Sequence, residues 1–202
     1  MQKTDLSKEQ KQYYRAKAAP ELVTIAAGNY IVVEGAGDPD TSDFKAKIKA
    51  LYATAYNVKK INKLQDKDFK VASLEGLWWT ECGEPVGDRP KEEWHWKLQI
   101  QMPSFVTRND FKQGAALAGN KNLPHLGELQ WESQPAALAA QILHIGPYSE
   151  ETPTLQKLDE YIQQHHLEVT GAHHEIYLSD PGKTAPGKLK TILRLDVKSL
   201  RD

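Results

Sequence analysis

The first half of the chain alternates apolar and polar residues in an order that predicts strand, helix, strand, strand. The β-branched and aromatic run at 29–34 predicts a strand, and the segment GAGDPD after it is typical of a turn. Thr41 or Ser42 can then cap a helix, and two further strands are predicted at 69–81 and 93–103, separated by a Gly- and Pro-rich turn. The apolar face of the predicted helix is formed by residues at helical spacing: Phe44, Ile48, Leu51, Tyr52, Ala55 and Val58.

The second half repeats the same order. A strand is predicted at 139–148, and Thr152 followed by Pro153 suits the start of a helix. Two final strands are predicted at 173–180 and 188–197. One side of the second helix is lined by four apolar or aromatic residues: Leu155, Leu158, Tyr161 and Ile162.

This repetition predicts an α+β fold made of two strand-helix-strand-strand modules related by a pseudo-twofold axis. We expect one antiparallel sheet, with helices on one face and a ligand groove on the other. Residues 1–20 are predicted to form an N-terminal arm, and 21–202 a single domain. Within that domain the first module spans about 21–106, a helical connection about 107–134 and the second module about 135–202.

Composition limits the range of partners. Twenty-six basic and 27 acidic residues give a formal net charge of -1, without a block of like charges that would favour nucleic acid. No apolar run approaches the length of a membrane span, and the N-terminus lacks the apolar stretch of a signal peptide. We therefore expect a cytoplasmic protein whose partner is neither nucleic acid nor membrane.

Strand alternation groups the candidate functional residues. In the stretch AHHEIYLSD, His173, Glu175 and Tyr177 point to one side, and the more apolar opposite side is expected to pack on a helix. In the first module Glu75 and Trp79 share a side. If the modules are equivalent, Glu75 occupies the position of Glu175, and two carboxylates face one cavity. The alternative is two exposed glutamates on a solvated sheet face.

Four of the five tryptophans lie in the strand pair of the first module. Trp94 and Trp96 alternate in step with apolar residues, so core packing is at least as good an interpretation as ligand contact. Trp78 and Trp79 are adjacent and must face opposite sides. The one beside Glu75 offers a flat wall for a planar ligand, and an acidic aromatic pocket suits planar cations or electrophiles.

Other chemistries have weaker support. Neighbouring histidines on a strand diverge and no HExxH motif is present, so we expect no metal site. The single cysteine, Cys82, has no evident histidine partner that would make it a nucleophile. GAGDPD lacks the third glycine of a dinucleotide fingerprint, and no GxSxG motif is present. No cofactor is expected.

Several stretches together resemble the GyrI-like small-molecule-binding family in its stand-alone form. They are YIVVEGAGDPD, LEGLWW, WHWKLQIQMPSFVT, QILHIGPYSEE, HHEIYLSDP and KLKTILRLDV, and the resemblance runs from about Pro20 to Val197. It implies the duplicated module predicted above. Relatives include effector domains of multidrug-responsive activators, in which a buried glutamate of the EIYL-like strand recognises lipophilic cations; the matching residue is Glu175. Others protect DNA gyrase from toxins.

One stand-alone branch of this family hydrolyses the cyclopropane ring of DNA-alkylating natural products of the yatakemycin type, and the tryptophan-rich sequence resembles that branch. The resemblance makes Glu175 the candidate for positioning or deprotonating water, with acid and base roles left open. Tyr148 and Tyr177 are candidates for hydrogen bonding to the developing oxyanion. Stacking is assigned to Trp79, with Trp96 as a second candidate. The ligand-binding candidates are Glu75, Trp78, Trp79, Trp96, His144 and His173.

His144, in HIGPY, is a possible proton donor, although a structural histidine beside a turn fits equally well. Three functions remain open. They are hydrolysis of an electrophilic planar aromatic compound, binding or sequestration of planar lipophilic drugs without chemistry, and gyrase protection through a protein contact. The same acidic aromatic pocket serves binding and catalysis alike. A homodimer is compatible with any of the three.

Overall fold

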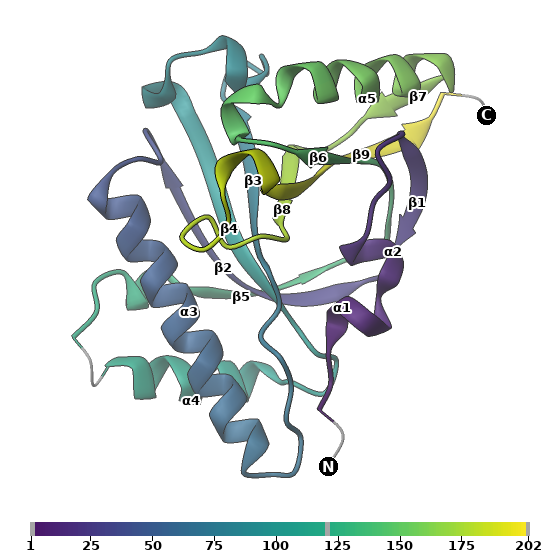
Figure 1. Ribbon diagram of the computed structural model, residues 1–202. Coiled ribbons are helices and arrows are strands. Elements are labelled where there is room, and N and C mark those ends of the chain that lie inside the picture. Colours follow the sequence, from purple (N-terminus) through teal and green to yellow (C-terminus); the bar gives the residue numbers. More distant parts are fainter. Residues whose placement is uncertain (1–2, 120–121, 201–202) are drawn as a thin grey trace.

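The computed structural model describes residues 3–119 and 122–200 and confirms the predicted α+β fold (Figure 1). The helices are α1 (Leu6–Glu9), α2 (Lys11–Tyr14), α3 (Ser42–Lys63), α4 (Arg108–Gly119) and α5 (Thr152–Gln164). The strands are β1 (Glu21–Ile25), β2 (Gly28–Ala36), β3 (Leu74–Thr80), β4 (Trp94–Met102), β5 (Gln130–Gln134), β6 (Ala137–Ile145), β7 (Leu167–Val169), β8 (His173–Tyr177) and β9 (Lys190–Ser199).

The sheet is built from two copies of one module. Its main path runs β1-β6-β9-β8-β3-β4-β2-β5, with β7 added beside β9, and all its pairs are antiparallel. β2, α3, β3 and β4 form the first module, and β6, α5, β8 and β9 form the second. The strand order is symmetric about the contact between β3 and β8, as a pseudo-twofold axis requires. Each leading strand crosses over, so that β1 pairs with β6 and β5 pairs with β2.

Each module helix packs on the sheet through the apolar residues that the sequence pattern predicted. α3 begins at the predicted cap, because the Thr41 side chain accepts a hydrogen bond from the Phe44 backbone N–H at 3.3 Å. Leu51 and Val58 of α3 are fully buried in the core of the first module. α5 begins one residue earlier than predicted, with Glu151 at the N-cap position. That shift places the carboxyl of Glu151 at the N-terminal end of α5.

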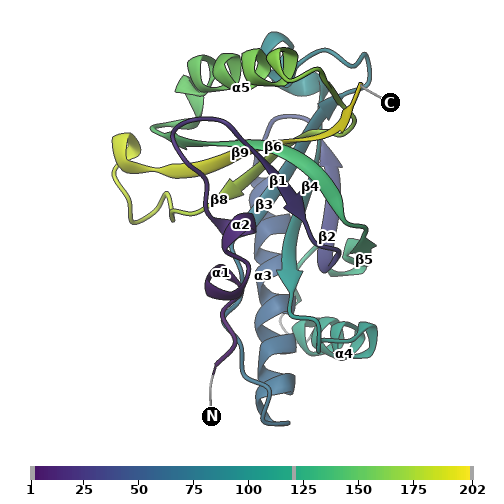
Figure 2. The same ribbon diagram turned by 90° about the vertical axis from the view of Figure 1, so that its right-hand side faces the viewer.

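The opposite face of the sheet is covered by the N-terminal arm. In Figure 1, α3 lies to the left of the central strands and α1 and α2 lie to their right; Figure 2 shows α1 and α2 from that second side. Tyr13 and Tyr14 are buried in a cluster with Tyr30 of β2 and Ile176 of β8. The expected groove opposite the helices is therefore wrong: the arm fills that face. Ile176, which was expected to pack on a helix, packs under the arm.

No helix within residues 3–119 and 122–200 is long and apolar enough to cross a bilayer.

Candidate functional site

A cavity of about 1760 Å³ lies on the helix side of the sheet, between α3 and α5. Its α3 wall carries Phe44, Ile48 and Tyr52, and its α5 wall carries Leu155 and Asp159. α3 packs on β2 and β4, and α5 packs on β6 and β7. The strands between them at which the two modules meet, β3 and β8, form the floor of the cavity. The volume exceeds the range of about 300–1,000 Å³ that is usual for small-molecule sites.

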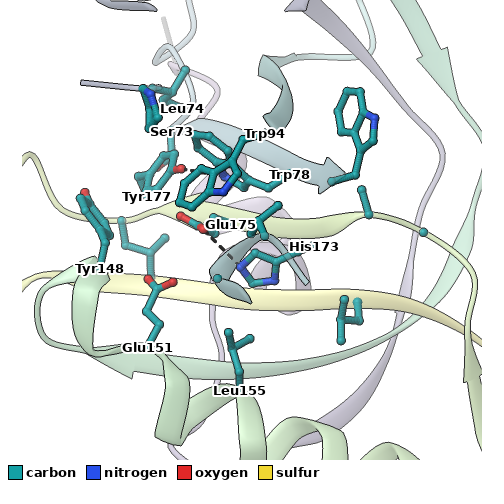
Figure 3. A pocket seen from close by; sticks show the side chains of 18 of the residues that line it. Ser73, Leu74, Trp78, Trp94, Tyr148, Glu151, Leu155, His173, Glu175 and Tyr177 are labelled. Atoms are coloured by element: carbon teal, nitrogen blue, oxygen red, sulfur yellow. Dashed lines mark hydrogen bonds and ion pairs between the residues drawn. The ribbon is translucent and has the colours of Figure 1, made fainter. Parts of the chain in front are cut away.

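Glu175 lies near the middle of this floor (Figure 3). Strand alternation turns His173, Glu175 and Tyr177 of β8 to the cavity together, as the sequence pattern indicated. Nε2 of His173 lies 3.2 Å from Oε1 of Glu175, and the Glu175 residue is 9% exposed. The carboxyl is thus reachable from the cavity while being largely shielded from bulk water.

Glu151 is the functional candidate that sequence reasoning missed. It comes from the N-cap of α5 and is 7% exposed. Its Oε1 is buried and has no hydrogen-bond partner among the described residues. Burial, followed by the negative charge of Glu175, raises the pKa of Glu151 to about 9. One ligand atom each from Glu151, His173 and Glu175 lies within 4.8 Å of the other two. These three side chains are called the carboxyl-imidazole cluster below.

Two tyrosines flank the cluster. Trp78 Nε1 donates a hydrogen bond to Tyr177 Oη at 3.3 Å. Burial, the charge of Glu175 and a hydrogen bond to it hold the pKa of Tyr177 well above its usual range. The ring of Tyr148 meets that of Tyr177 edge to face at 5.6 Å, and burial followed by the charge of Glu175 raises the pKa of Tyr148. Both phenols therefore keep their protons at neutral pH and can donate hydrogen bonds.

Gly76 leaves room for this arrangement. It is the direct partner of Glu175 across the β3 and β8 pair. A Cβ at this position would lie 2.8 Å from Nε1 of Trp78 and 2.9 Å from Oη of Tyr177, closer than real Cβ contacts allow. The missing side chain thus lets Trp78 and Tyr177 close over the floor of the cavity.

Glu75 does not share the cavity with Glu175, so the prediction of two equivalent carboxylates is wrong. Glu75 pairs directly with Ile176, and residues paired across strands project to the same face, which here is the arm side. Glu75 is fully buried. Its Oε2 accepts hydrogen bonds from Tyr13 Oη at 2.7 Å and Gln99 Nε2 at 2.8 Å, and lies 2.9 Å from Nε2 of His174. It is a component of the interior.

The structure also separates the tryptophan candidates. Trp96 is 1% exposed in the core, where its Nε1 donates to the Gly37 carbonyl at 3.2 Å, and it does not line the cavity. Trp79 projects to the side away from Glu175 and stacks on His95, reaching only the margin of the cavity. Trp78, on the face of Glu175, holds the position that the sequence pattern gave to Trp79.

His144 lies outside the cavity. It is 4% exposed, and its ring nitrogens lie 2.9 Å from Thr154 Oγ1 and 3.2 Å from the Pro147 carbonyl. These contacts tie the turn after β6 to the first turn of α5. His144 therefore fits the structural alternative that the sequence left open, and acts on the site only by holding the segment that carries Glu151.

The cavity is strongly acidic, although the chain is nearly neutral. Among residues 3–119 and 122–200, two lysines line it, Lys70 and Lys91. Eight carboxyl residues of the same ranges line it: Asp5, Asp40, Glu84, Asp88, Glu151, Asp159, Glu175 and Asp180. An acidic, aromatic-walled cavity attracts cationic or electron-poor planar molecules.

The fold and cavity define a small-molecule-binding protein, and comparison with known proteins agrees. The chain belongs to the GyrI-like small molecule binding domain family, whose model matches residues 18–198. It is 34% identical to an uncharacterized conserved protein from Listeria innocua, covering 97% of this chain and 100% of that one with a TM-score of 0.89. It is 32% identical to a hydrolase from Listeria innocua, covering 97% and 100% with a TM-score of 0.85.

A more distant structure shows the same fold alone. The C-terminal domain of EcmrR is 14% identical, with a TM-score of 0.58 over 90% of this chain and 98% of that one. A comparison with curated proteins found no significant match.

Proposed function

We propose that this protein is a hydrolase that opens the strained cyclopropane ring of planar, DNA-alkylating natural products and thereby detoxifies them. The observation that carries the proposal is the carboxyl-imidazole cluster at the floor of an acidic, aromatic cavity. The likeness to a protein described as a hydrolase, at 32% identity over nearly the whole chain, supports the reaction class.

The reaction needs only water. In a cyclopropane fused to a cyclohexadienone, the water oxygen attacks the ring methylene and a carbon–carbon bond of the three-membered ring breaks. The released electron pair moves through the six-membered ring to the carbonyl oxygen, which becomes a phenol after taking a proton. One water is added and nothing is oxidised or reduced, so the chain has to supply positioning, a base and hydrogen-bond donors.

The residues in and beside the carboxyl-imidazole cluster can supply the base, the positioning and the hydrogen-bond donors. Glu175 takes the proton from the attacking water, and His173, at 3.2 Å, orients its carboxyl. Glu151 keeps its own proton at neutral pH because its pKa is about 9, so its carboxyl can donate a hydrogen bond within the cluster and supply a proton. Tyr148, which is 41% exposed at the cavity wall, donates to the developing phenolate. Tyr177 donates its hydroxyl proton to Glu175 and takes the second donor position only when that hydrogen bond is released.

The cavity walls hold the planar part of the substrate. Trp78 and Trp94 both line the cavity, with ring centroids 5.8 Å apart at an angle of 79°. Phe44 stacks against Trp78 at 5.9 Å. An edge-to-face aromatic corner of this kind presents flat apolar surface on which the planar part of a polycyclic ligand can stack.

The test is a turnover assay. Purified protein is mixed with a cyclopropane-bearing DNA alkylator and product mass is followed with time, for wild type, Glu175→Gln, Glu151→Gln and the control Glu150→Gln. Glu150 is exposed, precedes Glu151 directly and does not line the cavity. We expect the gain of one water over many turnovers, lowered roughly 100-fold or more by Glu175→Gln and left unchanged by Glu150→Gln.

A second function, sequestration without chemistry, is favoured by the excess of acidic residues around the cavity, because that charge binds a planar cation whether or not a reaction follows. Tight binding of the alkylator with no change in mass would rule out the hydrolase. In that case Glu175→Gln should weaken cationic ligands far more than neutral ligands of the same shape.

A further inference from the structure

The carboxyl-imidazole cluster combines donor atoms from two elements that the core holds together. Glu151 comes from the N-cap of α5, and His173 and Glu175 come from β8. α5 is fixed to the sheet by Leu158 and Ile162, which are buried in one cluster with residues of β6 and β9. The three donor atoms, all within 4.8 Å of one another, therefore belong to a rigid part of the fold (Figure 3).

One buried carboxyl oxygen of the cluster is not satisfied by a hydrogen bond from any described residue. Oε1 of Glu151 is inaccessible and finds no hydrogen-bond partner in the part of the chain that the structure describes, and the residue is 7% exposed. A buried acceptor without a donor is costly, and such atoms in native proteins usually bind a water or an ion. In Figure 3 the Glu151 carboxyl points toward Glu175 and His173, so the group that carries the unsatisfied atom faces the rest of the cluster.

We propose that Glu151, His173 and Glu175 form a binding site for one divalent transition-metal cation, with Zn²⁺ as the best match. One imidazole and two carboxylates are the donor types that Zn²⁺ and similar borderline cations accept, whereas Mg²⁺ and Ca²⁺ prefer oxygen alone. Binding displaces the proton that Glu151 otherwise holds, and the two positive charges of the cation then balance the two carboxylates.

The geometry requires only a small contraction. Ligands about 2.1 Å from a tetrahedral Zn²⁺ lie about 3.4 Å from one another, somewhat closer than the present limit of 4.8 Å. Rotation of the Glu151 side chain can supply the difference, because its Oε1 gives up no existing hydrogen bond. Three protein ligands leave the fourth coordination position open on the side of the cavity.

Cation binding does not depend on the proposed hydrolysis, but the two compete for the same atoms. A bound cation would occupy the Glu175 oxygens that take the proton from water, and the His173 nitrogen that orients them. We therefore expect the loaded protein to hydrolyse its substrate more slowly than the metal-free protein. Faster hydrolysis after loading would overturn this competition.

The experiment measures binding without any substrate. Full-length protein is freed of metal with a chelator and titrated with Zn²⁺ by calorimetry, and with Co²⁺ by visible absorption. We expect one cation per chain, with affinity at least 10-fold weaker in Glu151→Gln, His173→Gln and Glu175→Gln and unchanged in Glu150→Gln. Circular dichroism confirms that each variant is folded.

Cys82 is the necessary second control, since it is exposed and thiols bind zinc. Binding that persists in Glu151→Gln and His173→Gln but disappears in Cys82→Ser would overturn the site, as would the absence of any binding by the wild type. Because turnover is measured separately on metal-free protein, failure of the hydrolase proposal and failure of the cation site appear in different experiments.

Discussion

The two faces of the central sheet each carry a glutamate beside a histidine. On the cavity side, His173 lies 3.2 Å from Glu175; on the arm side, His174 lies 2.9 Å from Glu75. The histidines are neighbours in sequence, and the glutamates sit on the paired strands β8 and β3. The residue types are the same, so the difference between the two pairs lies in what the fold adds to each.

On the arm side the fold supplies hydrogen-bond donors and seals the pair off. Tyr13 and Gln99 donate to Glu75, which is fully buried. On the cavity side it supplies a second carboxyl, Glu151, and access to a large cavity. A buried carboxylate whose neighbours are donors stabilises the interior, whereas a carboxylate placed beside another acid is poised for proton transfer or ion binding.

Glu75 and Glu175 are expected to differ most in what each contributes to the free energy of unfolding. Glu75→Leu leaves the buried side chains of Tyr13 and Gln99 and the partly buried His174 without their acceptor, so we expect a loss of about 3–5 kcal/mol in the free energy of unfolding. Glu175→Leu should cost less than about 1 kcal/mol, because its partners face a cavity that water can enter. Urea denaturation of both variants measures the comparison. Equal losses would show that the two glutamates are both structural.

The second expected effect is on the pH dependence of stability. Glu151 has a folded pKa of about 9 against an ordinary value of 4.5, so between these values the folded state holds a proton that the unfolded state has lost. Glu151 therefore contributes most to the free energy of unfolding below pH 4.5, and that free energy falls as the pH rises toward about 9. Glu151→Gln removes this dependence, and its stability relative to wild type should grow by about 2 kcal/mol or more over that range.

The expected pH dependence of stability is tested by measuring urea denaturation midpoints at a series of pH values. The proteins compared are wild type, Glu151→Gln and Glu150→Gln. The exposed neighbour Glu150 provides the control for the loss of one carboxyl from the same turn. Parallel curves for wild type and Glu151→Gln would mean that Glu151 is ionised in the folded protein, and would remove it as a proton donor.

The same comparison shows why the sequence predicted the fold better than the site. Helical and strand periodicities are local, and they correctly gave the duplicated module, whereas the family came from the resemblance of several stretches of sequence. The face of a residue depends on register, and a shift by one residue reverses it. Matching Glu75 to Glu175 by module equivalence was such an error, because Glu75 is opposite Ile176 and Gly76 is opposite Glu175.

Glu151 lay beyond prediction for a different reason. Its position follows from the contact between the N-terminus of α5 and β8, which no local pattern reports. The available signal was the start of a helix at Thr152 and Pro153, directly after two acidic residues. The groove was misplaced for a related reason: residues 1–20 were expected to form an arm lying on the domain, but no local pattern identified the face of the sheet that Tyr13 and Tyr14 cover.

The variant Tyr13→Phe should have a smaller effect, which is expected on stability and not on ligand binding. Tyr13→Phe removes one hydrogen bond to Glu75 and also the acceptor for the Tyr30 hydroxyl, so we expect a loss of about 1–2 kcal/mol in the free energy of unfolding. Binding of a planar ligand should hardly change, since Tyr13 does not line the cavity. The arm reaches the cavity through Asp5, Ser7 and Tyr14. A large loss of ligand affinity without a loss of stability would mean that Tyr13 shapes the cavity as well.

The smallest effect is expected from Trp78→Phe, which keeps an aromatic wall but removes the N–H that bonds to Tyr177 at 3.3 Å. A hydrogen bond of this length contributes less than about 1 kcal/mol, so turnover should fall only about threefold to fivefold through a looser Tyr177 beside Glu175. Trp94→Phe is the matched control, because Trp94 lines the same cavity while its N–H bonds to the Arg89 carbonyl. Affinity for a planar ligand should change equally in both variants. Equal losses of turnover in the two variants would mean that Trp78 acts only by stacking on the ligand. Glu175 alone would then orient Tyr177.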